Sequence, residues 1–581
     1  MENVRKRDAR GRFAPAGSGI DVAKLDARYE QLRTERSGWE PAWRDLAELF
    51  APQRYRADSD TDAHKKPEIN GALIDTVGVL GLRTLAAGLH GGMTSPVRPW
   101  FKLRLAHPDE GGTSAGVNAW LDEVTERMRL MLHASNFYNA VHGLFMDLGA
   151  FGTALMIETA DEEGLHFERV PCGTYVLDVN GKGSVDSFFR RVYLTGRQIA
   201  DLWPDTAPEN ISRPGSEGTR YEVIHGVYPR KDVAWGKKVG AKSKPFSSVY
   251  WIRGQGSGKA AVLSEGGYDM FPAFAPRWDV TVTDVYGRSP AMDVLPDCRM
   301  AQAMKETLRR TQHKAADPPM FGDLTVKRFG IDLSPGGRTF GDMTATGGRP
   351  LLVPIQQPDS GAMQHGQMAL QETEKTVEAG LYVDLFRMLL DDTRKQITAT
   401  EIQARQAEKL LLIGPVVERL HTELLSPIIA RTYNLMAEWN ALPEPPRGMG
   451  STALDVEFES VLAQAQKIAG TSSIEQALSF IANLSAVQPE AIDTLDVTAT
   501  AHAYLDRIGV PQACIADEDA VKAKRQQRAE AMQRQAAAEQ MAQAGQAAQD
   551  FTGAARNLGQ TPAGAGGETL MQTLLGGMGG G

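Results

Sequence analysis

Residues 112–116, GTSAG, have the Gly-x-Ser-x-Gly spacing that places a nucleophilic serine on a sharp turn between a strand and a helix. Ser114 would be the nucleophile. That turn requires a strand that leads directly into the serine, whereas Pro108 and two glycines precede it here. A hydroxyl just before a helix more often accepts hydrogen bonds from the first free backbone N–H groups. Thr113 or Ser114 is therefore interpreted as a helix N-cap, and no acyl-transfer chemistry is predicted.

A second candidate site lies in residues 254–259, GQGSGK, which are similar to a phosphate-binding loop. The leading glycine of that motif is missing, and Ala260 stands where a metal-binding hydroxyl is required, so a hairpin loop is the better interpretation. The eleven histidines include no His-Glu-x-x-His pattern. Asp391 and Asp392 could hold a metal, but adjacent carboxylates at a helix end are common. We predict no enzyme, no cofactor and no metal site.

A short charged segment carries the strongest functional signal, residues 391–406, DDTRKQITATEIQARQ. Thr398 stands three residues before Glu401, the spacing of a capping box in which each side chain satisfies the other's backbone amide. This box fixes where a helix begins, and an apolar helical pattern ends just before the segment. Arg394 and Lys395 therefore lie at the tip of a loop held at both ends. Two cations on rigid supports indicate contact with a polyanion.

The composition limits the function classes. A net charge of −9 argues against a protein that grips nucleic acid tightly, because tight binders carry a clear basic excess. It is compatible with passing contact, which needs only a few localised cations. No apolar run approaches the ~20 residues of a membrane span. The basic start of the chain lacks the apolar segment of a signal peptide, so a cytoplasmic protein is expected. The cysteines form no metal or redox spacing and are interpreted as reduced thiols: Cys172, Cys298 and Cys514.

The first half of the chain divides into three parts by pattern. Residues 1–19 are basic and predicted to be disordered, and their cations are either solvated or in contact with DNA or another assembly protein. Helical periodicity dominates from residue 20 to about 150. Short strand-like runs separated by Gly, Pro and Asn turns then predict a β-rich module over 153–284. Helical and strand-like patterns in separate parts of the chain predict a fold of the α+β class.

Two long helical patterns come next, 291–316 and about 364–390, separated by a Pro/Gly-rich insert over 317–361. The first is ~39 Å long if continuous. Helices of nearly equal length joined by a compact insert are expected to pack antiparallel. Charges near the end of the first and in the second have opposite signs and are predicted to face each other across the pair: Arg309, Arg310 and Lys314 against Glu372, Glu374 and Glu378.

The last third of the chain continues with helices. The helix that begins at Thr398 meets Gly414-Pro415 and later Pro427, which should kink or divide it. Alternating apolar and acidic residues over 454–458 predict a half-buried strand. Residues 519–549 are rich in Lys/Arg and then in Ala/Gln and predict a long polar helix. The glycine-rich end is expected to be a flexible tail.

Three segments together resemble the head-to-tail connecting (portal) proteins of short-tailed, T7-like bacteriophages. The most specific is ITATEIQARQAE, which is similar to the region of the family's tunnel loop. The second, YGRSPAMDVLPDCRMAQAMKETLRRTQHKAADPP, resembles the first stem helix and its exit. The third, LIDTVGVLGLRTLAAGLHGGMTSPVRPWFKL, lies near the N-terminus. They occur in the family's order and extend the resemblance over roughly residues 20 to 510.

The resemblance implies a portal-protein fold, mainly helical, in a ring of twelve copies. It assigns the chain in order to a wing (20–290), a first stem helix (291–316), a clip (317–361), a second stem helix (362–390), a tunnel loop (391–397), a kinked helix (398–450) and a crown (451–515), which the helix over 516–550 could extend as a barrel. The basic arm (1–19) and the flexible tail (551–581) lie outside the resemblance. The implied DNA-facing residues are Thr393, Arg394, Lys395 and Gln396, with Thr398 and Glu401 capping the next helix.

The resemblance also implies the partners. Rings at the unique capsid vertex, assembled in the bacterial cytoplasm, would pass double-stranded DNA without sequence specificity. They would bind the terminase large subunit, tail adaptor and tail proteins, and the major capsid and scaffold proteins. ATP hydrolysis would belong to terminase, and no membrane is involved. The alternative is another virion structural protein, such as a scaffold or tail adaptor. The β-rich module argues against a scaffold, which would be mostly helical and charged.

Overall fold

The chain forms two compact units, Met1–Ala482 and Asn483–Gly581. A computed structural model describes residues 21–56, 73–106, 115–161, 164–208, 211, 215, 218–230, 243–253, 260–281, 284–322, 332, 352–354, 359–390, 413–446, 454–459, 472–485, 500–501, 504 and 518–560. No helix among these residues is long and apolar enough to cross a membrane. Cys172 and Cys298 are buried free thiols, and Cys514 lies outside the described residues.

The core of the first unit is built around helix α6 (Phe137–Phe151), which is buried along almost its whole length. Its spacing of Phe137, Val141, Leu144 and Leu148 gives the apolar face that periodicity predicted. Around it in the same core lie residues of α2 (Glu40–Leu49), α3 (Val77–Met93) and α5 (Ala115–Ala134). The resulting cluster of buried side chains continues into residues 413–436 and is the main core of the protein.

Two antiparallel sheets lie where the sequence predicted strands. The larger has the strand order β4-β5-β6-β7-β8 and is a meander, because each strand pairs with the next in sequence. The smaller has the order β3-β2-β9. The strand bounds are β2 Leu155–Asp161, β3 Gly164–Val170, β4 Tyr175–Val179, β5 Val185–Thr195, β6 Arg220–Pro229, β7 Phe246–Ile252, β8 Ala261–Tyr268 and β9 Ala273–Phe274, with the short helix α7 (Gly196–Leu202) after β5.

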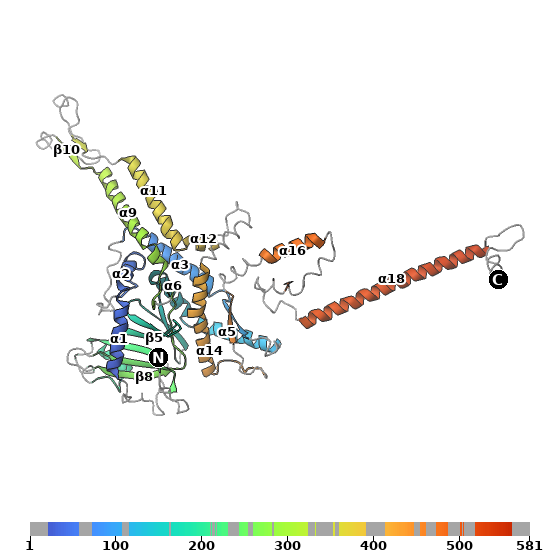
Figure 1. Cartoon of the computed structure of the whole chain (residues 1–581), viewed down its shortest axis with the longest axis horizontal. Helices are drawn as coiled ribbons and strands as arrows, with labels where there is room; N and C mark the ends of the chain where they lie inside the picture. The colour runs from blue at the N-terminus through green and yellow to red at the C-terminus, as the bar shows by residue number, and fades with distance from the viewer. Residues whose placement is uncertain are drawn as a thin grey trace, which may run out of the picture. The chain divides into compact units, whose positions relative to one another are not determined.

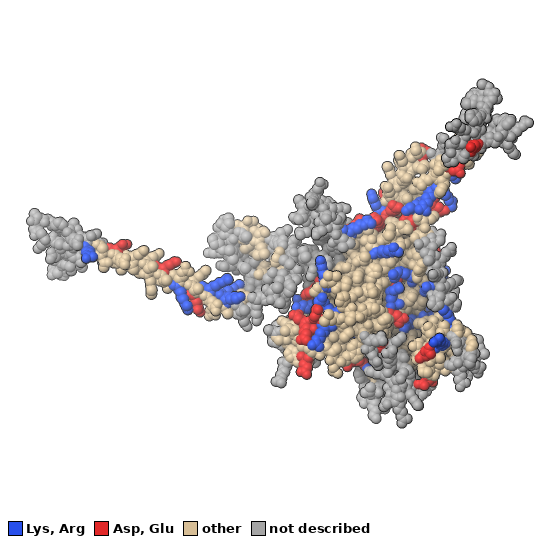
Figure 2. Space-filling model, turned by 180° about the vertical axis from the view of Figure 1, so that it is seen from behind, with Lys and Arg blue, Asp and Glu red and all other residues tan. Residues whose placement is uncertain are grey.

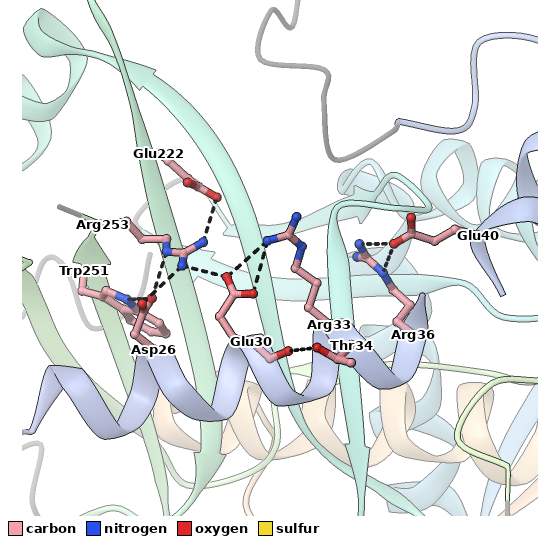
Figure 3. Close-up of polar contacts among 9 residues, drawn as sticks. All are labelled: Asp26, Glu30, Arg33, Thr34, Arg36, Glu40, Glu222, Trp251 and Arg253. Atoms are coloured by element: carbon pink, nitrogen blue, oxygen red, sulfur yellow. Dashed lines mark hydrogen bonds and ion pairs between the residues drawn. The ribbon is translucent and has the colours of Figure 1, made fainter. Parts of the chain in front are cut away.

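Helix α1 (Val22–Arg36) lies across the larger sheet and is held by both apolar and charged contacts. Tyr29 and Leu32 enter a small core with Phe189 and Trp251. Figure 3 shows the charged contacts, in which Arg253 of the sheet meets Asp26 at 3.0 Å and Glu30 at 2.7 Å on α1, and Glu222 at 3.7 Å. The buried Arg36 donates to the carbonyls of Gly173 and Tyr175. These contacts attach the first described helix to the β-rich part.

The two expected long helices are both broken. The first consists of α8 (Pro290–Asp293) and α9 (Leu295–Ala316), because Pro296 has no N–H to continue the hydrogen-bond ladder. The second consists of α11 (Ser360–Gly380) and α12 (Val383–Leu390). Between them Tyr382 adopts a left-handed backbone with φ 57°, which ends an α-helix. The single continuous helix predicted over 364–390 is therefore wrong, although both its halves are helical.

The remaining elements of the first unit return to the core. Residues 413–420 are helical, His421–Leu425 form a π-helical turn, and α14 (Ser426–Glu438) follows. The π turn precedes Pro427, which has no backbone N–H for the regular α-helical hydrogen-bond pattern. The helical path continues through this proline, and the predicted kink stays a prediction. The predicted strand is β12 (Leu454–Phe458), which pairs antiparallel with β1 (Phe101–Leu105). Helix α16 (Ser472–Ser485) follows, and the boundary between the two units falls within it, after Ala482.

The second unit contains one long helix, α18 (Glu518–Gln560). Every side chain from residue 523 to residue 550 is exposed. Its position agrees with the polar helix predicted over 519–549, and it continues to residue 560. Ala and Gln have high helix propensity, which lets such a helix form without an apolar face against a core.

Candidate functional site

Helices α9 and α11 lie side by side and antiparallel (Figure 1). The order of their contacts shows the direction: Leu308 lies against Gly366, Met304 against Thr373, and Val294 against Gly380. Glycines at two of these contacts let the helices approach closely, since a Cβ built at Gly380 would come 2.2 Å from Val294. Beyond their far end, β10 (Met320–Gly322) pairs antiparallel with β11 (Leu352–Pro354). The result is a helical hairpin tipped by a two-stranded ribbon.

The charges of the helical hairpin pair differently from the prediction. Arg310 contacts Glu306 on its own helix. Glu374 lies 3.7 Å from Lys305. Leu308 is level with Gly366, and the two helices run antiparallel. Residues after Leu308 therefore lie level with residues before Gly366. This places the three cations, Arg309, Arg310 and Lys314, more than a helical turn away from Glu372. No ion pair joins these cations to Glu372 or Glu374 within the described part of the chain. Opposite charges do meet across the hairpin, but the cation is Lys305 of α9 and its partner is Glu374 of α11.

Lys305 is the centre of the polar contacts at the base of the hairpin. Its Nζ lies 2.8 Å from Oδ2 of Asp75, which is 1% exposed and comes from the residues just before α3. The other carboxylate oxygen of Asp75 accepts from the backbone N–H of Val77 at 2.7 Å. Gln302, one turn earlier on α9, accepts from the backbone N–H of Asp75 and donates to its carbonyl. Helix α9 is therefore fixed to the start of α3.

The two carboxylates at Lys305 differ in pKa. Burial opposes ionisation of Asp75, but hydrogen bonds from Lys305 and Val77 and the charge of Lys305 outweigh it, so the pKa of Asp75 is lowered. Burial raises the pKa of Glu374, and its hydrogen bond with Asp75 and the repulsion between the two carboxylates raise it further. At neutral pH Lys305 therefore acts as the counter-ion of Asp75.

Two glycines of α3 form the surface on which α12 packs, and this surface is called the seat of α12. A Cβ built at Gly81 would come 2.6 Å from Leu381, and one at Gly88 would come 2.1 Å from the ring of Phe386. Neither position has room for a methyl group. Helix α12 leads into residue 391, where the predicted DNA-facing segment begins. The seat on α3 thus determines the direction in which the chain enters that segment.

The predicted DNA-facing residues Thr393, Arg394, Lys395 and Gln396 lie outside the described residues, as do Thr398 and Glu401 of the predicted cap. Their role and the capping box remain predictions. What the structure gives are the two supports of the segment, namely α12 on one side and the helix from residue 413 on the other. Both supports lie in the main core, through Leu385 and Phe386 and through Ile413 and Val417.

The ribbon at the end of the hairpin exposes apolar side chains. Phe321 and Val353 are cross-strand partners in the register of β10 and β11, and they are 67% and 45% exposed. Met320 is exposed beside them. Neighbouring exposed apolar side chains on a short ribbon are typical of a surface that contacts a partner.

Sequence patterns gave no sign of the contacts made by the π turn. Glu423 accepts from the backbone N–H of Arg277 at 3.0 Å, and its other oxygen lies 2.7 Å from the Arg277 guanidinium. The ring of His421 stacks on Phe458 of β12 with centroids 4.1 Å apart. Burial lowers the pKa of His421 to about 4. The only signal in the sequence was Pro427, which indicated an irregular helix and not its partners.

The catalytic look-alikes gain no support. Helix α5 begins at Ala115, and Ser114 lies outside the described residues. The segment 254–259 also lies outside them, but the strands on either side, β7 and β8, pair antiparallel as the hairpin interpretation requires. Among the described residues no group of His, Cys, Asp and Glu side chains could hold a metal ion.

Comparison with known proteins identifies a family and relatives of this chain. A sequence model of the family described as "Bacteriophage head to tail connecting protein" matches residues 22–515. The chain is 35% identical over 516 residues to a probable portal protein of Bordetella phage BPP-1, covering 87% of this chain and 91% of the relative. It is 34% identical over 515 residues to the portal protein of Salmonella phage epsilon15, again covering 87% and 91%.

Two solved structures that match come from gene transfer agent particles. One is the neck of the empty particle, with a TM-score of 0.30 and 11% identity over 71% of this chain and 87% of that one. The other is the native virion, with a TM-score of 0.28 and 12% identity over 70% and 86%.

The family model and the two phage relatives define a class, the proteins that connect a phage head to its tail. The chain belongs to the bacteriophage head-to-tail connecting protein family, and its relatives from both phages are portal proteins. The resemblance found in the sequence is thereby confirmed.

Proposed function

We propose that copies of this chain form a closed ring of twelve at one vertex of the phage capsid, through which double-stranded DNA enters and later leaves. The antiparallel α9–α11 hairpin carries the proposal. It is a rigid rod fixed at one end to the core by Lys305 and Asp75, and it ends in an exposed apolar ribbon at the other. Such rods side by side form the wall of a channel, and their tips form a ring of docking surfaces.

The parts of the chain receive the roles that the family suggests. The proposed wing comprises residues 20–290, the stem α9 with α11 and α12, the clip 317–361, the tunnel loop 391–397, and the crown 451–515. Helix α18 would extend the crown as a barrel. The broken second helix supports this division, because the turn at Tyr382 lets α12 leave the hairpin and lie on the glycines of α3.

The proposed partners follow from the exposed surfaces. The apolar ribbon of β10 and β11 would dock the terminase large subunit during packaging and a tail adaptor afterwards. The rim of the ring would contact the major capsid and scaffold proteins. The chain would contribute no chemistry, and the energy of packaging would come from terminase. Arg394 and Lys395 would meet the phosphates of the passing DNA.

Electron microscopy of the purified protein tests the proposal directly. Negative-stain images should show rings with a central hole, and class averages should show twelvefold symmetry. A monomer, or a filament without a hole, would contradict it. Another virion structural protein, such as a tail adaptor, is the second candidate. An adaptor would bind a portal ring that has already formed, and rings of an adaptor would not bind terminase. A terminase pull-down on the purified rings therefore distinguishes a portal protein from an adaptor.

A further inference from the structure

Helix α18 begins with Glu518 and Asp519, and a concentrated positive charge follows these two acidic residues. Residues 522–534 contain five Lys or Arg and one Glu, a net charge of +4, in a chain whose total is −9. The C-terminal part of the helix, residues 535–560, contains two acidic residues and one Arg. Figure 2 shows the Lys and Arg side chains gathered at the end where α18 begins. The charge is therefore a local patch and not a property of the whole helix.

Three of these cations share one face. Lys524 and Arg528 are four residues apart and Arg525 lies three before Arg528, so at ~100° per residue the three side chains fall within about 100° of the helix circumference. All three are exposed. Arg534 points away from them, and it lies 3.8 Å from Glu530. The face formed by Lys524, Arg525 and Arg528 is called the basic face below.

The helix offers no apolar seam that a partner helix would need. Its large exposed apolar residues in this region are Met532 and Met541, 73% and 78% exposed. They are nine residues apart, which places them on opposite sides of an α-helix. A coiled coil requires apolar residues that recur along one side. Recognition of the basic face must therefore depend on charge and not on apolar packing.

We infer that the basic face of α18 binds the phosphate backbone of double-stranded DNA. Cations one turn apart on an exposed, straight helix can contact successive phosphates, and this contact needs no sequence information. The inference rests on the proposed function, since it makes α18 a second DNA contact besides Arg394 and Lys395. An acidic protein surface is the competing partner.

The test measures the affinity of the full-length protein for a short DNA duplex of mixed sequence as salt is raised from about 50 to 200 mM. The test variant is Lys524→Gln with Arg528→Gln, which keeps the helix propensity. The matched control is Lys24→Gln with Arg197→Gln, two exposed helical cations in the first unit, which changes the net charge equally. Circular dichroism and ring images check that both variants fold and assemble.

We expect the test variant to bind more weakly and to lower the slope of log affinity against log salt by about two, whereas the control leaves the slope unchanged. An unchanged slope in the test variant overturns the inference. If Arg394→Ala with Lys395→Ala then lowers the slope, the proposed DNA channel stands without α18. The inference would also be overturned if the test variant lost association between copies while its salt slope for DNA stayed unchanged. The basic face would then contact protein and not DNA.

Discussion

The ring of Phe386 lies directly against Gly88. A Cβ atom at Gly88 would come 2.1 Å from Cγ and Cδ1 of that ring, much closer than any real contact between carbon atoms. The two residues are almost 300 positions apart, and their contact joins α12 to α3 immediately before the segment predicted to face DNA. The direction of the chain at residue 390 thus depends on the absence of one methyl group.

Gly88→Ala should therefore move α12 or strain the contact. Overpacking of a filled core costs about 1–3 kcal/mol, which should exceed the gain of up to about 1 kcal/mol that Ala brings to a helix. The expected result is a lower free energy of unfolding in urea. Rings of the variant should also package DNA less efficiently, because the entry to residues 391–397 shifts.

Gly91→Ala is the matched control, since it lies on the same helix with nothing within 4 Å of its Cβ position. This variant should be neutral or more stable. Equal unfolding free energies for the two variants would mean that α12 accommodates a side chain at Gly88 freely and that the seat does not fix its direction.

Lys305→Met tests the base of the hairpin. The substitution keeps the length of the side chain but leaves the buried carboxylate of Asp75 without its counter-ion, and we expect a loss of about 2–3 kcal/mol in the free energy of unfolding. Glu374→Gln should cost much less, because Glu374 is farther from Lys305 and more exposed than Asp75. Urea unfolding of both variants at neutral pH makes the comparison.

The same pair gives a pH dependence with a defined sign. The pKa of Asp75 is lower in the folded protein than in the unfolded chain. The ionised carboxylate therefore stabilises the fold at pH values above the unfolded-state pKa, and this stabilisation is lost as the pH falls through the lowered, folded-state pKa. Lys305→Met removes most of that lowering. The difference in stability between wild type and Lys305→Met should therefore shrink as the pH falls below about 4. A constant difference would show that the lysine stabilises by packing alone.

The stacked His421 predicts acid sensitivity at a higher pH. Its pKa of about 4 lies below the ordinary 6.5, so the unfolded chain binds this proton more readily and stability falls as the pH drops from 6.5 to 4. The full effect is at most about 3 kcal/mol. His421→Phe keeps the stack on Phe458 and should lose less stability than wild type between pH 7 and pH 5 in urea unfolding.

The exposed His365 of α11 supplies the control for this measurement. His365→Gln should keep the pH dependence of the wild type. If His421→Phe also kept it, the acid sensitivity would belong to other groups, such as the buried His225, whose pKa is held well below its ordinary value by burial and by Arg190.

Regular elements were predictable from the sequence where a local pattern determines them. The apolar spacing of α6, the strands between residues 155 and 274, and the alternation in Leu454–Phe458 all gave the right element type. The break at Tyr382 was not predictable, because no glycine stands at the left-handed position and the break is supported by packing on α3. Neither was the partner of β12, since pairing with β1 joins residues about 350 positions apart.

The candidate site was predictable only in its outline. Two helices of nearly equal length joined by a compact insert predicted an antiparallel pair, and the pair exists. Which charges pair depends on the register of the two helices. Packing of Leu308 against Gly366 fixes that register, and a sequence pattern does not contain this contact. The bond between Glu423 and Arg277 joins residues 146 positions apart, and no spacing rule reaches that far. Contacts between distant segments must come from the fold.

Replacement of residues 318–358 with a short Gly/Ser linker tests the ribbon and the proposed clip. Asp359 is kept, because its side chain caps α11 by accepting from the N–H of Gly361 at 3.0 Å. The protomer should stay folded and soluble, since the ribbon contributes nothing to the main core. Stable rings and terminase binding should be lost in gel filtration and pull-down. Normal rings that bind terminase fully would show that the docking surface lies elsewhere.

The predicted tunnel loop is tested by charge reversal. Arg394→Ala with Lys395→Ala should preserve fold and ring, because exposed loop charges usually change stability by less than about 0.5 kcal/mol. Packaging or retention of the genome should decrease. Arg394→Glu with Lys395→Glu should be worse, since it places a ring of negative charge against a backbone with one negative charge per ~1.7 Å.

The measurement is the length and retention of DNA in particles assembled with each variant. Lys24→Glu with Arg197→Glu, on the first unit's exposed helices, is the control for the change in net charge and should package normally. Wild-type packaging by the double-Glu rings would exclude an electrostatic role for the loop. Failed assembly of those rings, with normal assembly of the control, would mean that Arg394 and Lys395 hold the ring together and do not face DNA.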